Sequence, residues 1–509
     1  MSSTELWRLS ASEIATRTSA GDISAEQATA SAVARMEAVN PALNAVIESL
    51  ADEAAERARD LDLARADGRP LGRLHGVPVT IKVNVDQTGH ATTNGVVALK
   101  DLIAPANAPI VDNLLAEGAV VIGRTNTPEF SFRADTDNPL YGRTHNPWGD
   151  HVSPGGSSGG AGSAVMAGIG ALGHGNDIGG SLRFPAAANG AVTVKPGLGR
   201  VPAWNPSQTA ERGMLAQSMS VQGILAREAR DLHVSMPAAI APDPRDPFHV
   251  PLPWRGDALE GPVKVAFTKD TCGFDLHPEV SAALDAARDA LADAGYDIEE
   301  IEPPYLQEAG SVGYRTLMGE VRELMGPAIQ DQGSDTIRAI FDEYFDQFAP
   351  FEGKELLAMM AKRSFYAREW SLFLQRYPDG ALSAEAGVLQ IEAVAATDAD
   401  RAVKLADLWL GTQPDHGRRV DVLTLRATLA RDRLEDCRRA LPSYRELARI
   451  ATGGAQARAL AYQGICAAQV GDAAQAAPAL DAALSHSSLP RALAPRVRAA
   501  RDRLREDSP

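Results

Sequence analysis

Cysteine is scarce in this chain of 509 residues, and basic residues are fewer than acidic ones. The three cysteines, Cys272, Cys437 and Cys466, are widely spaced and odd in number, so they predict neither a disulfide framework nor a metal cluster. Reduced thiols are the simplest interpretation. Lysine and arginine number 50 against 66 aspartates and glutamates, and the formal net charge is −16. This charge argues against nucleic acid or an anionic membrane as a partner, because both attract basic surfaces.

Long apolar runs and a leader pattern are also missing from the sequence. No stretch of about 18 apolar residues is free of charge and glycine, as a membrane-spanning helix would require. Residues 1–8 lack the basic-then-apolar order of a signal peptide. We therefore expect a soluble, cytoplasmic protein. The apolar fraction of 45% is that of a globular protein, and the length allows a large buried core plus an appendage.

Residues 1–70 have the pattern of helices that cover a sheet. Ser10 or Ser12 can cap one helix and Ser24 a second, and from Leu43 to Ala64 apolar residues recur at helical spacing. From Gly76 the pattern changes to short apolar runs. The runs are residues 77–83 and 119–123, with a helical segment at 109–117 between them. Strand, helix and strand in this order predict an α/β fold.

Glycine dominates residues 153–180, where three short motifs compete. Gly168-x-Gly170-x-x-Gly173 matches a dinucleotide-binding fingerprint, but it ends a helical stretch instead of following a strand. The pair Gly155 and Gly160 begins like a phosphate-binding loop, but the lysine of that motif is missing. Gly155-Gly-Ser-Ser-Gly has the nucleophile-elbow pattern, which would make Ser157 the nucleophile. The segment 160–173 is nearly all small residues and predicts a tightly buried helix behind a site.

Lys82, Ser157 and Ser181 predict a different, hydrolytic site. Lys82 ends an apolar strand-like run, and the two serines lie 24 residues apart, which is enough for one helix and a return loop. An amine and two hydroxyls can form a proton relay, while neighbouring glycines bring backbone N–H groups close to a reacting carbonyl. Taken one at a time, such residues are usually a solvated charge and turn serines. Their combination is what points to catalysis.

The motifs around these residues resemble the amidase signature family of serine hydrolases over about residues 5–378. The matching segments are GRTNTPE at 123–129, GRTHNPW at 142–148, SPGGSSGG at 153–160, DIGGSLRFP at 177–185 and KPxxGRVP at 195–202. The resemblance implies a mixed central β-sheet with helices on both faces. It also implies a Ser-Ser-Lys triad without metal or cofactor, in which Ser181 is the nucleophile, Ser157 the bridging serine after a cis peptide bond, and Lys82 the base. The oxyanion hole is then formed by the backbone N–H groups of Ile178, Gly179, Gly180 and Ser181.

The implied chemistry is physically consistent. Neutral Lys82 takes a proton from Ser157, which takes one from Ser181 as Ser181 attacks the amide carbon, and the relay runs in reverse to protonate the leaving amine. A lysine acts in this way only if burial lowers its pKa well below about 10.4.

Residues next to the triad are interpreted as supporting or as departures. Ser158, Asp177 and Arg183 are expected to hold the loops by hydrogen bonds and charge. Val83 stands where the family usually has Asp, and Asn176 where it usually has Thr. These departures bear on rate and substrate preference more than on the reaction. The nearby histidines are interpreted as structural or substrate-lining, namely His145, His151 and His174.

The resemblance ends near Pro378. Residues 379–509 contain no asparagine, so the family's Asn-x-x-Gly-x-Pro segment and closing strands are absent, and an Ala-, Arg- and Leu-rich region of helical period follows instead. Residues 460–483 fit one tetratricopeptide-like helical pair with Gly471-Asp472 as its turn, and a plain helical bundle fits them as well. We therefore expect an amidase-like domain at 1–378, which lacks the family's last strands, and an all-α segment at 379–509.

The sequence thus predicts an amidohydrolase that cleaves a carboxamide to a carboxylate and ammonia or an amine through an acyl-enzyme on Ser181. Its partner is a small-molecule amide, and the helical tail adds either self-association or a protein partner. Two other functions stay open. One is a catalytically impaired protein that acts through its tail, and the other is the glutaminase component of a transamidating complex.

Overall fold

The computed structural model describes residues 3–254, 263–374, 391, 394–395, 398–412 and 418–506. Its contacts divide the chain into two compact units. The first comprises Met1–Trp254 and Val312–Met360, and the second Arg255–Ser311 and Ala361–Pro509. The domain boundary expected at Pro378 lies outside the described residues.

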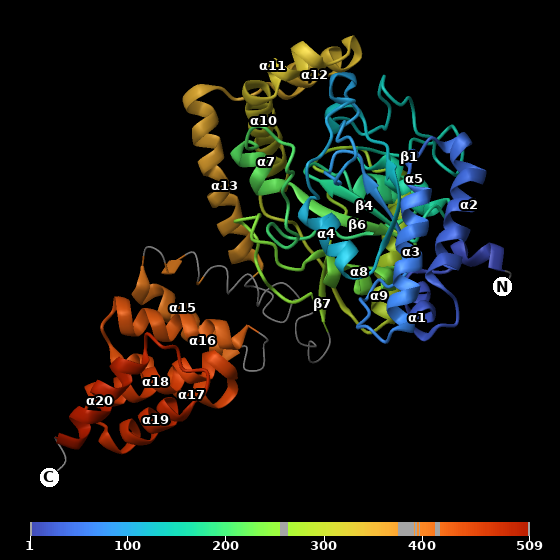
Figure 1. Ribbon diagram of the computed structural model, residues 1–509. Coiled ribbons are helices and arrows are strands. Elements are labelled where there is room, and N and C mark those ends of the chain that lie inside the picture. Colours follow the sequence, from blue (N-terminus) through green and yellow to red (C-terminus); the bar gives the residue numbers. More distant parts are fainter. Residues whose placement is uncertain are drawn as a thin grey trace. The chain divides into compact units, whose positions relative to one another are not determined.

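A six-stranded mixed sheet forms the centre of the first unit (Figure 1), with the strand order β1-β3-β2-β4-β6-β5. The strands are β1 (Val46–Ser49), β2 (Pro78–Lys82), β3 (Val120–Thr125), β4 (Leu172–Asp177), β5 (Val192–Thr193) and β6 (Val221–Ala226). β2 pairs in parallel with β3 and β4, and the other pairings are antiparallel. β2 and β3 are buried along their whole length, as expected for the inner strands of a parallel arrangement. The predicted α/β alternation is confirmed.

The N-terminal helices begin where the sequence indicates. α1 (Ala11–Ala20) starts at a capping box formed by Ser10 and Glu13, and α2 (Ala25–Leu43) starts at one formed by Ser24 and Gln27. In each box the serine hydroxyl accepts a backbone N–H that the first helical turn leaves unpaired.

The helical interpretation of residues 43–64 is wrong in its first part. β1 follows α2 after two residues, and only then does α3 (Ala51–Ala66) begin. A strand of four residues is too short for its own periodicity to show in the sequence. It exists because Val46, Glu48 and Ser49 pair with β3, which lies far along the chain.

Small residues allow α5 (Gly159–Met166) to pack close to the sheet. The buried helix expected over residues 160–173 is confirmed only as far as Met166, and its last part is wrong because β4 begins at Leu172. Residues 159–165 are all buried. A Cβ atom at Gly160 would lie 2.5 Å from the backbone nitrogen of Asn126 and 2.8 Å from the carbonyl oxygen of Ala45. No side chain fits at this distance, so α5 requires glycine where it crosses these segments.

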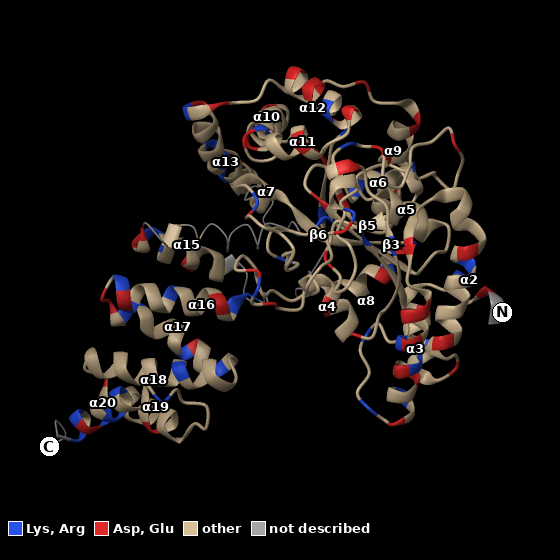
Figure 2. Cartoon of the chain, turned by 45° about the horizontal axis from the view of Figure 1, so that its top comes forward, with Lys and Arg blue, Asp and Glu red and all other residues tan. Residues whose placement is uncertain are grey.

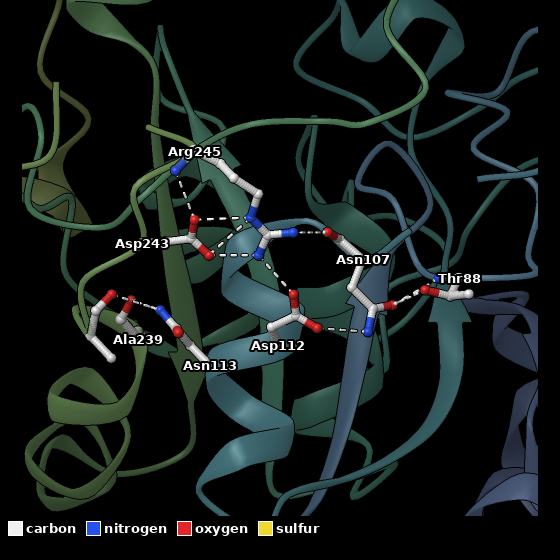
Figure 3. Close-up of polar contacts among 8 residues, drawn as sticks. Thr88, Asn107, Asp112, Asn113, Ala239, Asp243 and Arg245 are labelled. Carbon is white, nitrogen blue, oxygen red and sulfur yellow. Dashed lines mark hydrogen bonds and ion pairs between the residues drawn. The ribbon is translucent and has the colours of Figure 1, made fainter. Parts of the chain in front are cut away.

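Polar contacts connect α4 (Pro109–Ala116) to the segment that follows α8 (Ala229–Ala239) (Figure 3). Arg245 Nη2 donates to Asp112 Oδ2 at 2.7 Å, and its Nη1 donates to the carbonyl oxygen of Asn107 at 3.0 Å. Asn113 Nδ2 donates to the carbonyl oxygen of Ala241 at 2.8 Å. These contacts hold the β2–β3 crossover helix against the rest of the unit.

Two further helices, α6 (Arg183–Asn189) and α7 (Met214–Met219), lie between strands of the sheet in the sequence, and the others follow its last strand. The others are α9 (Pro278–Asp293), α10 (Leu306–Leu324), α11 (Gly326–Gln332), α12 (Asp335–Phe348) and α13 (Gly353–Leu374). In the second unit, β7 (Lys264–Phe267) and β8 (Asp297–Glu300) pair in parallel. Within the described ranges every helix is too short or too polar to cross a membrane.

The described part of the tail is all helical, as expected. Its helices are α15 (Ala399–Thr412), α16 (Arg419–Thr428), α17 (Cys437–Ile450), α18 (Gly453–Gln469), α19 (Ala473–Ser485) and α20 (Ala494–Glu506), and each packs against the next. Gly471 has a positive φ of 81° in the turn between α18 and α19, where the side chain of Asp472 caps α19. Arginine dominates the last helix (blue in Figure 2), which carries five arginines and two acidic residues.

Two cysteines of the tail form a disulfide. Cys437 at the start of α17 and Cys466 in α18 are bonded, with their Cα atoms 5.0 Å apart. The expectation of three reduced thiols is therefore wrong for this pair, because packing of α17 on α18 brings together residues that lie 29 positions apart in the sequence. Cys272 is a free thiol.

Candidate active site

The structure brings Lys82 and Ser157 into direct contact at the carboxyl end of β2. Lys82 Nζ lies 2.7 Å from Ser157 Oγ, 3.1 Å from Ser158 Oγ and 2.8 Å from Asn176 Oδ1. The lysine side chain is fully buried, and both serines are buried as well. β2 and β4 are parallel neighbours, so their carboxyl ends place Lys82 and Asn176 at the same edge. Open α/β sheets bind ligands at this edge.

Burial sets the protonation of the lysine. Removal of water lowers the pKa of the Lys82 ammonium well below its usual range, and the negative charge of Asp177 opposes this effect. His174 lies beneath, where its Nδ1 accepts the backbone N–H of Lys82 at 3.4 Å and its Nε2 lies 3.0 Å from Gln222 Oε1. Burial lowers the pKa of His174 to about 3, so the ring is neutral near pH 7.

The loop before α5 is held from several sides. The peptide bond between Gly156 and Ser157 is cis, as the resemblance implies. Thr127 Oγ1 donates to the carbonyl oxygen of Ser157 at 2.9 Å. A Cβ atom at Gly156 would lie 2.3 Å from the carbonyl oxygen of Arg133, so the segment around residue 133 packs directly against the loop.

Asp177 organises the loop that carries Ser181. Its buried carboxylate accepts the backbone N–H groups of Gly180 at 2.8 Å and Leu182 at 3.1 Å. Arg183 adds a two-pronged contact, with Nε and Nη2 each 3.0 Å from a carboxylate oxygen. Burial alone would raise the pKa of Asp177, but the hydrogen bonds from Arg183, Gly180 and Leu182 outweigh it and lower the pKa below its ordinary value. The carboxylate is therefore charged at neutral pH and fixes the turn.

The four backbone N–H groups expected in the oxyanion hole are not equivalent. The N–H of Gly180 is occupied by Asp177 Oδ1. Gly179 faces α10, because a Cβ atom there would lie 3.9 Å from the ring of Tyr314. Ile178 packs against an apolar cluster that includes Leu317 and Phe341 of α10 and α12. Aromatic and aliphatic side chains thus lie beside the loop that carries Ser181.

Sequence reasoning missed the amide side chains around the lysine. Asn176 stands out in the sequence only as a departure from the family, yet it contacts Lys82 directly, and Asn84 pairs with it. One signal was available, because positions 82 and 84 share a side in extended backbone. Val83, the other departure, is fully buried. Among the described residues, no cluster of three or more His, Cys, Asp or Glu side chains has the arrangement of a metal site.

Comparison with known families decides which group of proteins this site belongs to. The amidase family model matches residues 27–376. The chain belongs to the amidase family. The match covers well over half of the chain, includes Lys82, both serines and the Asp177 loop, and ends before the helical tail. With the family established, the activity class is amide hydrolysis.

Curated relatives and solved structures agree with this assignment. An indoleacetamide hydrolase of Bradyrhizobium diazoefficiens is 46% identical over 373 residues, which cover 73% of this chain and 71% of the relative. A glutamyl-tRNA(Gln) amidotransferase component of Moorella thermoacetica is 36% identical over 312 residues, 60% of this chain and 62% of that protein. A bacterial aryl acylamidase of the amidase signature family superposes with a TM-score of 0.63 at 25% identity, over 72% of this chain and 78% of that chain.

Proposed function

We propose that this protein cleaves a carboxamide to a carboxylate and ammonia or an amine through an acyl-enzyme on Ser181. One observation carries the proposal, namely the fully buried Lys82 with its Nζ 2.7 Å from Ser157 Oγ. A buried lysine with a strongly lowered pKa is neutral and able to accept a proton. The same observation argues against a catalytically impaired chain, because the lysine and its serine partner are in hydrogen-bonding contact.

The proposed reaction begins with proton transfer along the relay. Lys82 Nζ accepts the proton of Ser157 Oγ, Ser157 Oγ accepts that of Ser181, and Ser181 Oγ forms a bond to the amide carbon. When the tetrahedral intermediate collapses, the C–N bond breaks, and the proton returns from Lys82 through Ser157 to the leaving nitrogen. Water then attacks the acyl carbon with the same relay as base, the bond between the acyl carbon and Ser181 Oγ breaks, and the relay returns the proton to Ser181 Oγ. The products are the carboxylic acid and ammonia or an amine.

Three backbone N–H groups are the proposed donors to the oxyanion, those of Ile178, Gly179 and Ser181. Gly180 is left out of the set because its N–H donates to Asp177 Oδ1 at 2.8 Å. Its role is then to give the loop its turn, since its φ is +115°. Loss of a single oxyanion donor in comparable sites costs about 3–4 kcal/mol of transition-state stabilisation.

An amide with an aromatic acyl or amine group is the proposed substrate. The named relatives hydrolyse indoleacetamide and aryl acylamides by their names, and Tyr314 lies 3.9 Å from the Cβ position of Gly179 in the Ser181 loop. Steady-state kinetics with indoleacetamide and with propionamide test this proposal. We expect a higher kcat/KM for the aromatic amide, and equal values would contradict it.

A covalent probe tests the nucleophile. A fluorophosphonate should label Ser181, identified by mass spectrometry of the digested protein, and Ser181→Ala should lose both label and activity. Heat-denatured protein is the control for nonspecific labelling. A label on Ser157 that persists in Ser181→Ala would instead support the nucleophile-elbow interpretation.

Glutamine hydrolysis within a transamidating complex is the second candidate. It is favoured by the 36% identity to a glutamyl-tRNA(Gln) amidotransferase component. Release of ammonia from glutamine by the purified chain, at a higher kcat/KM than from indoleacetamide, would support it. If the purified chain does not hydrolyse glutamine, this second candidate is excluded and the amidase proposal is the one that remains.

We propose that the tail is a separate, repeat-like helical domain that begins near residue 378. We also propose that this domain binds a protein partner. A surface hollow of about 320 Å³ is lined by Arg438, Leu441, Pro442, Arg445, Val470 and Asp472. Four of these residues lie at 438, 441, 442 and 445 on one face of α17. Asp472 is engaged with the N-terminus of α19, and within the described ranges Arg438 and Arg445 have no acidic partner. The occupant that fits is an acidic peptide segment with an apolar side chain between its carboxylates.

Fluorescence anisotropy with the full chain tests this surface. The probe is a fluorescein-labelled peptide in which leucine is flanked by glutamates. The double substitution of Arg438→Glu and Arg445→Glu should weaken binding at least tenfold, whereas Arg498→Glu on α20 should leave it unchanged. Equal binding by all three proteins would overturn the proposal. Light scattering measures the mass in solution. If the native protein has the mass of two chains and the double variant that of one, the occupant of this surface is a second copy of the chain. The cytoplasmic location stays a prediction.

A further inference from the structure

Two asparagine side chains form a reciprocal pair next to Lys82. Asn176 Nδ2 donates to Asn84 Oδ1 at 3.0 Å, and Asn84 Nδ2 lies 3.3 Å from Asn176 Oδ1. The same Asn176 Oδ1 accepts from Lys82 Nζ at 2.8 Å. Asn176 is the penultimate residue of β4, and Asn84 follows Lys82 by two residues. The pair therefore bridges the carboxyl ends of β2 and β4 around the lysine.

The orientation of both amides follows from their neighbours. Thr127 Oγ1 donates its only proton to the carbonyl oxygen of Ser157. Ser131 Oγ lies 3.0 Å from Thr127 Oγ1 and 2.6 Å from Asn94 Oδ1, so the single proton of Ser131 goes to one of these two. Ser131 must then accept from Asn84 Nδ2, which lies at 2.9 Å.

This constraint propagates to the lysine. Because Asn84 Nδ2 faces Ser131, Asn84 Oδ1 faces Asn176 Nδ2. Asn176 Oδ1 must then face Lys82 Nζ, since an asparagine amide has its oxygen and nitrogen on opposite sides. A flipped Asn176 would place two amide oxygens against each other.

A neutral lysine offers two N–H donors and one lone pair. Asn176 Oδ1 has no proton to give, so it takes one N–H at 2.8 Å. Ser158 Oγ lies 3.1 Å from Nζ and 3.4 Å from the carbonyl oxygen of Asn176, so its proton has an acceptor elsewhere and its oxygen takes the second N–H. Ser157 Oγ, the closest neighbour at 2.7 Å, is left facing the lone pair.

We propose that Asn176 is the positioning residue of Lys82, and that its side-chain oxygen orients the lysine lone pair toward Ser157 Oγ. The proposal rests on the proposed function, in which Lys82 accepts the proton of Ser157. It also explains why a neutral amide suits this position. A carboxylate at the same distance would favour the lysine's protonated form, whereas an amide oxygen accepts the N–H without adding charge.

The pH dependence of hydrolysis separates positioning from a structural role. Asn176→Asp places a negative charge about 2.8 Å from Nζ, by the geometry of the native side chain, and raises the pKa of Lys82. Activity needs the neutral lysine, so the acidic limb of kcat/KM should move upward by about 1–3 pH units, with recovery at higher pH. Gln330→Glu adds the same charge at an exposed site and should leave the limb where it is.

Substitutions without charge test the orientation itself. Asn176→Ala should lower kcat at least tenfold with KM within twofold of native, because the lysine loses its fixed lone-pair direction while substrate contacts remain. Asn84→Ala should lower kcat in the same direction, and the double variant should add little, because Asn84 acts through Asn176. Circular dichroism and the melting temperature show that each variant folds. If Asn176→Ala does not fold, Asn84→Ala and Asn176→Asp carry the test.

The outcomes distinguish this inference from the proposed function. Suppose that activity depends on Lys82. An unchanged acidic limb in Asn176→Asp, or a native kcat in Asn176→Ala, then overturns the role of Asn176 and leaves the relay intact. Full activity of Lys82→Ala removes the lysine from the mechanism and overturns both.

Discussion

The backbone N–H of Ser158 donates to the carbonyl oxygen of Ser181 at 3.2 Å. This hydrogen bond joins the loop that precedes α5 to the loop that follows β4, so the two serine-bearing loops are tied by main chain as well as by the side-chain set around Lys82. A change in either loop is therefore expected to affect the other, and variants of the site need a folding control.

Replacement of Lys82 should separate activity from stability. Lys82→Met is expected to lower kcat by roughly 10²–10⁴ because the general base is lost. In the native protein the folded lysine has a pKa well below that of the unfolded chain, which is about 10.4. Between these values the unfolded chain binds one more proton, so the free energy of unfolding rises with pH.

Urea unfolding over a pH series measures this contribution. The rise should be present in the native protein and absent from Lys82→Met, and the variant should be the more stable of the two at the lower end of the window. Identical pH dependence of the two proteins would show that the lysine is not buried as the structure has it.

His174 should make the fold sensitive to acid. Its folded pKa is about 3, against about 6.5 in an unfolded chain. Between these values only the unfolded state binds the proton, so the free energy of unfolding falls as pH is lowered, by about 1.4 kcal/mol per pH unit. His174→Asn removes the titrating ring. Urea unfolding from pH 7 to pH 4 gives the free energy of unfolding at each pH, and it should fall more steeply with decreasing pH in the native protein than in the variant. Equal slopes would show that the ring is solvated instead.

Glycine at position 160 should be irreplaceable. A Cβ atom there would lie 2.5 Å from the backbone nitrogen of Asn126, so Gly160→Ala forces α5 away from the sheet edge and is expected to cost about 3 kcal/mol or more. Gly310 is the matched control, because it lies in a helix with nothing within 4 Å of its Cβ position. Gly310→Ala should stabilise by about 0.5–1 kcal/mol. If the melting temperatures of the two variants shift equally, this packing of α5 is contradicted.

Thiol counting tests the pairing in the tail. Protein purified without reductant and unfolded in guanidinium should expose one reactive thiol, that of Cys272, and three after reduction. Mass mapping should find Cys437 and Cys466 in one linked peptide pair. Three thiols before reduction would show that the sequence-based expectation of free cysteines was right.

Local signals predicted a good part of the fold and the residues of the site. The caps at Ser10 and Ser24 and the buried run that ends in Lys82 can be recognised because each depends on neighbours along the chain. The relation of Lys82 to Ser157 followed from motif resemblance. Its geometry comes from strand pairing that no local pattern encodes.

Other features could not be predicted because they exist only through contacts between distant segments. β1 is a strand only because it pairs with β3. Asn84 and Asn176 are separated by 92 positions, and they meet because β2 and β4 pair as neighbouring strands. The bond between Cys437 and Cys466 likewise depends on how α17 packs on α18.

Asp177 serves two requirements that pull in opposite directions. Its carboxylate shapes the turn through Gly180, Leu182 and Arg183, and its charge raises the pKa of the lysine that burial must lower. Loop geometry and base strength are thus coupled through one side chain. Neither can be tuned by evolution or by engineering at this position without a compensating change in the other, and the ion pair with Arg183 is where such compensation is most directly available.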